Sequence, residues 1–170
     1  MIIRQARPDD VDAICTIWND MIRDTLITFT TDLKTNEGVA ADIIARGTRF
    51  LVAEHEGQVL GFATYGPFRP GPGYRYTAEH SIQLAKDARG QGIGRQLLQR
   101  LEAVAIDHDI HTLVAGISSA APESMAFHAA MGFVETARLP AVGFKADQWL
   151  DLILMQKRLR AMPDTAPATG

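Results

Sequence analysis

The chain carries the segment LAKDARGQGIGRQLL at residues 84–98, between a strand-sized run and a helical stripe. The run covers residues 77–84, and Leu97, Leu98 and Leu101 recur at helical spacing. Glycines between a strand and a helix let backbone N–H groups converge without Cβ atoms in the way. Such a turn at a helix N-terminus binds phosphate, helped by the helix dipole. The segment therefore predicts a phosphate-binding turn, with a glycine-rich turn that binds no ligand as the alternative.

Three known phosphate motifs can be compared with this segment. A Walker A loop requires Gly-Lys-Ser/Thr after four spacer residues, and the sequence contains none. The dinucleotide fingerprint GxGxxG requires a glycine at the position of Arg95. The third pattern, Arg/Gln-x-x-Gly-x-Gly/Ala, is met by Arg89, Gly92 and Gly94. In this it resembles the pyrophosphate loop of the GNAT superfamily of N-acetyltransferases.

The rest of the chain is typical of one α+β domain over residues 1–160. A glycine at 57 lies between two apolar runs, which indicates a hairpin. Helices are expected over about 8–22, 35–46 and 122–131, and a further helix is expected to follow the glycine loop and to run to about residue 105. Strands are expected near 2–7, 50–53, 59–65, 77–84, 112–117, 133–139 and 149–155. Residues 161–170 hold two prolines and almost no core-forming residues, so we expect a disordered tail there.

Composition excludes several classes of protein. A net charge of −3 and a pI near 5.9 argue against nucleic-acid binding. No apolar run is long enough to span a membrane, and the N-terminus lacks the pattern of a signal peptide. The single Cys15 falls in a helical apolar stripe, where we expect a buried core thiol rather than a nucleophile or a metal ligand. We therefore expect a cytoplasmic protein without a metal site.

Further blocks of sequence extend the resemblance. The segment SMAFHAAMGF at 124–133 is similar to the GNAT helix that ends in Gly-Phe beside the CoA arm. The segments RPGPGYRYTAEHSI at 69–82 and VGFKADQWLDL at 142–152 resemble the phosphinothricin and methionine sulfoximine N-acetyltransferase family. The resemblance covers residues 3–159, and is weaker before residue 50. It implies a GNAT-like fold: a central, mixed and mostly antiparallel sheet flanked by helices.

The same resemblance implies acetyl-CoA as co-substrate and assigns the residues that contact it. The expected cofactor residues follow the strand and the glycine loop: Ile82, Gln83 and Leu84 along the pantetheine arm, and Arg89, Gly90, Gln91, Gly92, Ile93, Gly94 and Arg95 around the pyrophosphate. The family often has asparagine in the place of Ala121. The contact that such a side chain would make is therefore expected to be missing.

Catalytic and acceptor residues are implied in the same way. Glu79 falls where the family places an active-site carboxylate, and it suits a general base; an ion pair with Arg75 or Arg89 is the alternative. His128 stands where many superfamily members have tyrosine, and it is expected to pass a proton to the leaving sulfur; a structural histidine is the alternative. Arg69, Arg75 and Thr77 are expected near the acceptor, since guanidinium suits carboxylate and phosphinate groups.

We therefore expect acetylation of the primary amine of a small amino-acid-like molecule, of the phosphinothricin, methionine sulfoximine or methionine sulfone type. The amine is expected to attack directly in a ternary complex, since no Ser-His-Asp or Cys-His pattern is evident. The resemblance also implies a homodimer, in which Trp149 and the segment around Lys145 reach the neighbouring active site. Two alternatives stay open: a peptide or protein N-terminal acetyltransferase, and a CoA-binding sensor without catalysis.

Overall fold

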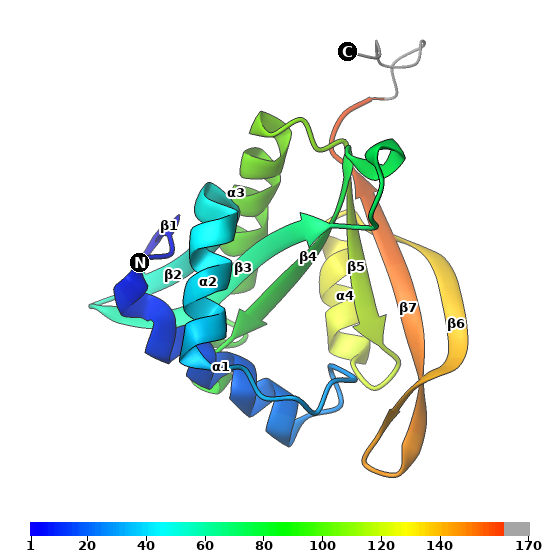
Figure 1. The fold of residues 1–170 in the computed structure, drawn as a ribbon. Coiled ribbons are helices and arrows are strands. Elements are labelled where there is room, and N and C mark those ends of the chain that lie inside the picture. The colour runs from blue at the N-terminus through cyan, green and yellow to red at the C-terminus, as the bar shows by residue number, and fades with distance from the viewer. Residues whose placement is uncertain (162–170) are drawn as a thin grey trace.

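One sheet of seven strands runs through the computed structural model, which describes residues 1–161 (Figure 1). The strands lie in the spatial order β1-β2-β3-β4-β5-β7-β6. Neighbouring strands are antiparallel except β4 and β5, which are parallel. The predicted mixed, mostly antiparallel sheet is therefore confirmed. The strands are β1 (Ile2–Gln5), β2 (Phe50–His55), β3 (Gln58–Pro67), β4 (Thr77–Leu84), β5 (Thr112–Ser118), β6 (Val134–Lys145) and β7 (Gln148–Arg158).

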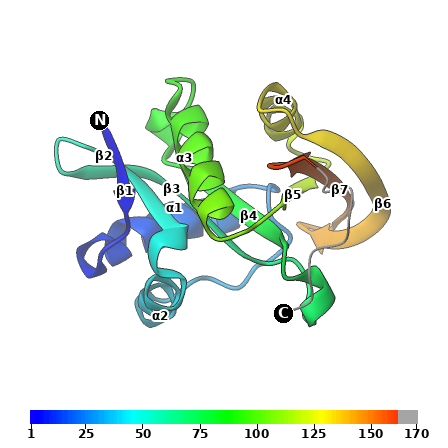
Figure 2. The same ribbon diagram turned by 90° about the horizontal axis from the view of Figure 1, so that it is seen from above.

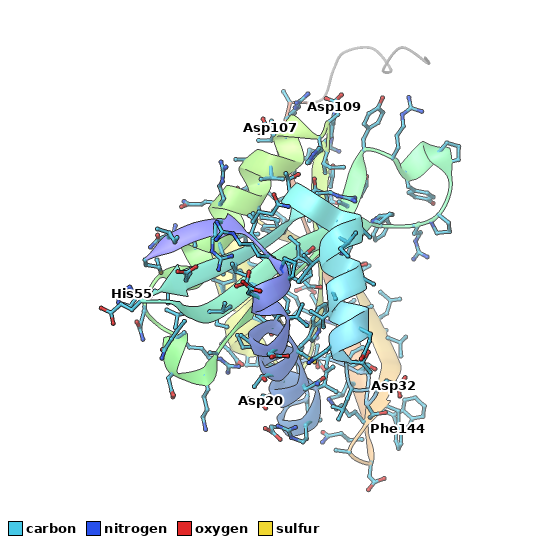
Figure 3. All side chains as sticks on the ribbon, turned by 60° about the vertical axis from the view of Figure 1, so that its left-hand side comes forward. Asp20, Asp32, His55, Asp107, Asp109 and Phe144 are labelled. Atoms are coloured by element: carbon cyan, nitrogen blue, oxygen red, sulfur yellow. The ribbon has the colours of Figure 1, made fainter. Side chains whose placement is uncertain are left out.

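Helices cover both faces of the sheet (Figure 2). On one face α1 (Val11–Asp24) and α2 (Asn36–Arg46) pack over Phe50, Val52 and Phe62. On the other face lie α3 (Ile93–Asp107) and α4 (Pro122–Ala130), and α3 packs over Leu51, Ala63 and Leu113. Because side chains alternate along a strand, neighbouring residues of β2 serve the two different cores. Charged side chains such as Asp20, Asp107 and Asp109 stay at the periphery (Figure 3).

Local signals explain where several elements begin and end. Thr35 caps α2, because its Oγ1 accepts a hydrogen bond from the Gly38 N–H at 3.1 Å. The β2–β3 hairpin turns at Glu56 and Gly57, whose φ angles are 50° and 79°. Gly132 has a φ of 88° just after α4, which suits a residue that ends a helix. These three predicted elements are confirmed.

The C-terminal hairpin is longer than the two strands predicted there. Its strand β6 continues through Pro140 to Lys145, with a register shift between Leu139 and Gly143. Since β6 is the edge strand, a proline in it removes no hydrogen bond that the sheet needs. The first strand is shorter than predicted, since it ends at Gln5. Of the predicted tail at 161–170, residues 162–170 lie outside the described residues.

The parallel pair β4–β5 is paired over only part of its length. Its register runs from Thr77 opposite Thr112 to Glu79 opposite Val114 and stops there. β4 continues to Leu84 and β5 to Ser118, and the two strands diverge (Figure 1). Within residues 1–161, the edge of β4 from His80 onward therefore has no strand partner on the β5 side. Among the described residues no helix is both long and apolar enough to cross a membrane.

Candidate active site

The glycine loop and the start of α3 form one wall of a cleft of about 460 Å³, and β4 and α4 form the others. Gln91 does not line this cleft. Its side-chain amide turns to the Asp87 carbonyl, with Nε2 and the oxygen 2.8 Å apart. The other nine predicted cofactor residues all line it: Ile82, Gln83, Leu84, Arg89, Gly90, Gly92, Ile93, Gly94 and Arg95.

The backbone of the loop fits an anion. Gly90 and Gly92 have φ angles of 75° and 77°, which favour glycine. Gln96 donates to the Gly92 carbonyl at 3.3 Å and so begins the hydrogen bonding of α3. The N–H groups just before Gln96 have no acceptor inside the helix and can donate to a ligand. With Arg89 and Arg95 beside them, these groups suit a pyrophosphate.

A smaller inner cavity of about 150 Å³ adjoins the cleft. Ile27, Ile82, Gln83, Ser124 and His128 line both spaces. The inner cavity lies where β4 and β5 have parted, since Ser81 and Gly116 line it from the two strands. Trp18, Met21 and Thr28 border it from the side of α1. The junction of the two spaces is therefore a place where two reactants can meet.

Glu79 lies beside the inner cavity. A Cβ atom placed on Gly116 would lie only 2.9 Å from Glu79 Oε1, so the carboxylate sits directly over this glycine. Partial burial raises the pKa of Glu79 above its usual value, although the charge of Arg69 acts in the opposite direction. Within residues 1–161 the carboxylate forms no ion pair with Arg75 or Arg89. A carboxylate with a raised pKa beside a cavity suits a general base.

His128 lies on α4 and is 3% exposed. Its Nδ1 is 2.7 Å from the Ser124 carbonyl oxygen, and its Nε2 is 3.0 Å from His80 Nε2. Both ring nitrogens therefore have partners within the protein. To give a proton to a sulfur in the cleft, the ring would have to leave one of them. The role of His128 as a proton donor stays a prediction.

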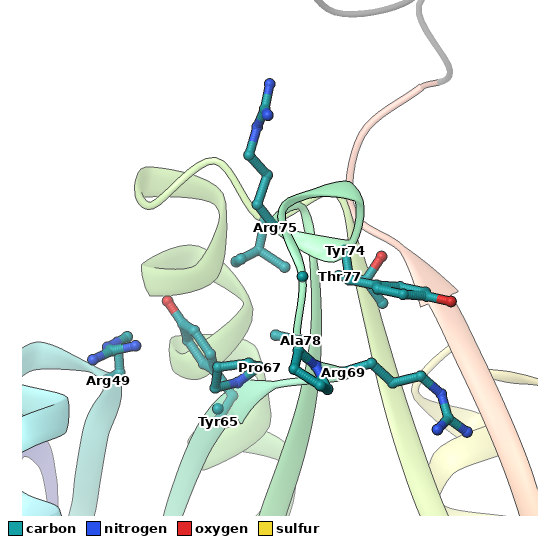
Figure 4. A pocket seen from close by; sticks show the side chains of 12 residues that line it. Arg49, Tyr65, Pro67, Arg69, Tyr74, Arg75, Thr77 and Ala78 are labelled. Atoms are coloured by element: carbon teal, nitrogen blue, oxygen red, sulfur yellow. The ribbon is translucent and has the colours of Figure 1, made fainter. Parts of the chain in front are cut away.

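The remaining acceptor residues, Arg69, Arg75 and Thr77, border a different hollow of about 330 Å³ (Figure 4). This hollow shares no lining residue with the cleft or the inner cavity. The Arg75 guanidinium lies 4.6 Å from the Tyr76 ring centroid and points away from Arg69 (Figure 4). Arg69 is close enough to Glu79 to lower its pKa. The structure therefore brings Arg69, but not Arg75, toward the carboxylate.

The sequence did not indicate several residues that shape this site. Ile27 and Glu123 line the cleft, and Gly116 makes room for Glu79. Ser124 and Phe127 also line the cleft, on the helix that the resemblance places beside the CoA arm. The pairing of His80 with His128 was also missed. Strand alternation in TAEHSI does place His80 on the opposite face from Glu79. That pattern does not reveal which helix residue it meets.

Comparison with known proteins decides the family. The model of the acetyltransferase (GNAT) family matches residues 15–133, more than half of the chain. The chain belongs to this family. Its fold, its class as an N-acetyltransferase and its use of acetyl-CoA are thereby confirmed.

Three proteins of known name are similar to this chain over most of its length. L-methionine sulfoximine/L-methionine sulfone acetyltransferase of Pseudomonas aeruginosa is 38% identical over 161 residues, covering 92% of this chain and 94% of its own. A phosphinothricin acetyltransferase from Sinorhizobium meliloti, solved with acetyl-CoA, superposes with a TM-score of 0.92 at 31% identity, covering 99% of this chain and 94% of its own. A ribosomal-protein-alanine N-acetyltransferase from Brucella melitensis has a TM-score of 0.89 at 42% identity, covering 93% and 99%. The predicted resemblance to the first two groups is confirmed.

Proposed function

We propose that this acetyltransferase acetylates the primary amine of a small amino-acid-like molecule by direct attack in a ternary complex. The observation that carries the proposal is the junction of the cofactor cleft with an inner cavity beside Glu79. At about 150 Å³ the cavity equals the liquid volume of roughly five waters, which suits a small acceptor. The names of the phosphinothricin and methionine sulfoximine relatives support the same substrate class.

The residues divide the chemistry between them. Acetyl-CoA supplies an activated acetyl thioester, and the loop Gly90–Arg95 with Arg89 would hold its pyrophosphate. The unpaired edge of β4 near Ile82 and Leu84 offers backbone groups to the pantetheine arm and the thioester. Glu79 takes a proton from the acceptor amine, directly or through a water. Holding both reactants at one junction supplies a further part of the rate.

Initial-rate kinetics with acetyl-CoA and a panel of amines test this proposal, with thiol release and the mass of the product as readouts. Phosphinothricin, methionine sulfoximine and methionine sulfone should be acetylated at their α-amine, with the intersecting kinetic lines of a ternary complex. Parallel lines would indicate a covalent enzyme intermediate. Faster turnover of peptides beginning with alanine would favour a protein acceptor, the activity named for the Brucella melitensis structure. Binding of acetyl-CoA without any turnover would indicate a sensor.

We also propose that the enzyme is a homodimer that pairs through the β6–β7 hairpin. Val142, Phe144 and Trp149 on this hairpin are 51%, 52% and 66% exposed, and the Phe144 and Trp149 rings lie 4.9 Å apart. Figure 3 shows Phe144 at the rim of the molecule. Exposed apolar clusters of this kind mark interaction sites. A Phe144→Ser, Trp149→Ser double variant should lower the mass measured by light scattering to that of a monomer.

A cytoplasmic location is proposed as well, because acetyl-CoA is a metabolite of the cell interior. Acetyltransferase activity should accordingly appear in the cytoplasmic fraction of a lysate. Recovery of the activity only from a membrane or extracellular fraction would contradict it.

A further inference from the structure

Two buried imidazole rings meet beneath the junction of the cleft and the inner cavity. His80 on β4 is 6% exposed and His128 on α4 is 3% exposed, and their Nε2 atoms are 3.0 Å apart. The Phe133 ring packs against both, with centroid distances of 5.3 Å to each. His128 lines both spaces, whereas His80 lines only the inner cavity. His80 therefore lies behind His128 as seen from the cofactor cleft.

The partners of the rings decide where the hydrogens lie. The Ser124 carbonyl can only accept, so His128 Nδ1 at 2.7 Å must carry a hydrogen. A neutral imidazole has one N–H, which leaves His128 Nε2 as an acceptor. The hydrogen between the two Nε2 atoms then comes from His80. His80 Nδ1, which forms no hydrogen bond with a described residue although the Val114 backbone lies nearby, is then left without a hydrogen.

Their surroundings keep both rings uncharged. Burial and the neighbouring His128 lower the pKa of His80 to about 3, while the nearby Val114 backbone acts in the opposite direction. Burial also lowers the pKa of His128, against the effect of the Ser124 carbonyl. Lys157 of β7 lies 6.0 Å from the Phe133 ring centroid and is paired with Glu102 of α3. Glu123 of α4 lines the cleft as His128 does, and Glu79 precedes His80 on β4. Neither imidazole forms an ion pair in the described part of the chain.

We propose that His80 is a positioning residue for acetyl transfer: its Nε2–H holds the neutral His128 ring in place at the junction where both reactants meet. The proposal rests on the proposed function of that junction. It gives His128 a defined tautomer, with its hydrogen on Nδ1, and a fixed ring plane. The His128 ring lines both spaces, and fixing it keeps the thioester and the amine aligned. Small displacements of such supporting groups reduce reaction rates strongly.

The tautomers can be measured directly, without any turnover. Long-range ¹⁵N–¹H correlation spectra of the ¹⁵N-histidine-labelled protein at neutral pH should show His80 with its hydrogen on Nε2 and His128 with its hydrogen on Nδ1. His80→Gln and His128→Gln variants assign the signals among the five histidines. His80 should stay neutral down to about pH 5, since its pKa is lowered to about 3, and His128 should take up a proton only below the usual histidine pKa. A hydrogen on His128 Nε2, or an imidazolium at neutral pH, would overturn the proposal.

Two substitutions of His80 separate donation from packing. His80→Gln places an amide N–H near the position of Nε2, whereas His80→Leu keeps a similar volume without a donor. Leaving His128 Nε2 without a donor should lower kcat about tenfold or more in the leucine variant. The glutamine variant should recover to within about threefold of the parent. The Kd for acetyl-CoA should change less than about twofold in both, since His80 does not line the cleft.

His108 is the matched control. Its Nδ1 is also hydrogen-bonded, to Tyr65 Oη at 2.9 Å, but His108 lines neither the cleft nor the inner cavity. His108→Leu should leave kcat close to that of the parent. Full activity of His80→Leu, or equal losses in the two His80 variants, would overturn the positioning role. If the leucine variant does not fold, the spectra of the parent still decide. A parent that acetylates no amine would refute the proposed function, while the measured tautomers would still show whether His80 donates to His128.

Discussion

The Glu79 carboxylate lies over Gly116, on the neighbouring strand of the sheet, at the end of the paired part of β4 and β5. No other residue type leaves this space free, because a Cβ on Gly116 would sit 2.9 Å from Glu79 Oε1. The glycine therefore fixes where the proposed base points. Gly116 also lines the inner cavity, so the same residue borders both the carboxylate and the proposed acceptor space.

Gly116→Ala should therefore displace the Glu79 side chain and lower kcat by about tenfold or more, with little change in the Kd for acetyl-CoA. Gly66→Ala is the matched control, because Gly66 is paired with Glu79 on the other side of β4 and a Cβ there would meet no atom within 4 Å. Steady-state kinetics and isothermal titration with acetyl-CoA measure the two effects. Equal kcat values in the two variants would show that the placement of Glu79 over Gly116 does not matter.

The pH dependence of kcat/KM should report the pKa of Glu79. A base acts when it is deprotonated, so activity should fall as the pH drops through a pKa that burial has raised above the usual value. Glu79→Gln should lower turnover by about a hundredfold or more and remove this acidic limb. Arg69→Gln removes the charge that lowers the pKa, so the limb should move to higher pH.

All three proteins are compared on one acceptor, so that the ionisation of its own amine is common to them. An acidic limb that persists in Glu79→Gln would assign the titration to another group. Unchanged turnover of that variant at every pH would make Glu79 a structural residue.

Gly92 should be sensitive to substitution because of its backbone, not because of a lack of space. A Cβ on Gly92 would meet no atom within 4 Å, but its φ of 77° strains any other residue by about 1–3 kcal/mol. In Gly92→Ala we expect the turn to relax and the Kd for acetyl-CoA to rise about tenfold. Isothermal titration measures the change.

Gly57→Ala is the control for this strain, since Gly57 has a φ of 79° in the β2–β3 turn, also with nothing within 4 Å. It should lose similar stability in urea unfolding while binding acetyl-CoA as the parent does. Equal affinities in both variants would remove Gly92 from the cofactor site.

Local patterns account for the parts of the fold that were predicted correctly. The glycine loop, the hairpin turn at Gly57 and the stop at Gly132 depend on residues close together in sequence, where backbone preferences suffice. Contacts between distant residues were not predictable in this way. His80 and His128 are 48 residues apart, and their contact depends on how α4 packs against the separated strands. Gly116 beneath Glu79 likewise requires the register of a parallel pair.

The C-terminal hairpin shows the same limit. A strand was predicted near 133–139, and the position of β6 at the sheet edge explains why the strand continues through Pro140. The segment around Lys145, with Trp149, is expected to reach a neighbouring active site, which stays a prediction. The Lys145 side chain itself is 7% exposed and turned into its own chain, where Nζ donates to the carbonyls of Ile22 and Thr28 at 2.6 and 3.1 Å.

Lys145→Met should therefore loosen the segment after α1. The substitution removes two hydrogen bonds from a buried site at the C-terminal end of a helix and should cost about 1–3 kcal/mol of unfolding free energy. Because Ile27 and Thr28 line the inner cavity, the KM for the acceptor should rise as well. Urea unfolding and steady-state kinetics measure the two effects. Lys86→Met, at an exposed lysine, is the control and should change neither; an acceptor KM unaltered in Lys145→Met would separate this contact from the site.

The charge of the acceptor should matter more to Arg69 than to Arg75. Arg69 influences Glu79, whereas Arg75 stacks on Tyr76 and points away (Figure 4). Losing one charge-assisted contact costs about 1.5–3 kcal/mol, or roughly tenfold or more in kcat/KM. Arg69→Ala should therefore cause such a loss with phosphinothricin or methionine sulfone, and a smaller one with an uncharged amine of similar size. Rates are compared on the plateau of the pH profile, because removing Arg69 also shifts the pKa of Glu79.

Arg75→Ala is the comparison, and within one chain it should affect acidic acceptors less than Arg69→Ala does. Mixing inactive Glu79→Gln protein with Arg75→Ala protein then tests whether Arg75 serves the other subunit of the proposed dimer. In a mixed dimer, the active Glu79 site would face an intact Arg75 across the interface, so activity toward acidic acceptors should recover if Arg75 acts there. If Arg69→Ala, Arg75→Ala and the parent all act equally fast on charged and uncharged acceptors, an arginine contact with the acceptor is excluded. General amines or peptides would then be the favoured acceptors.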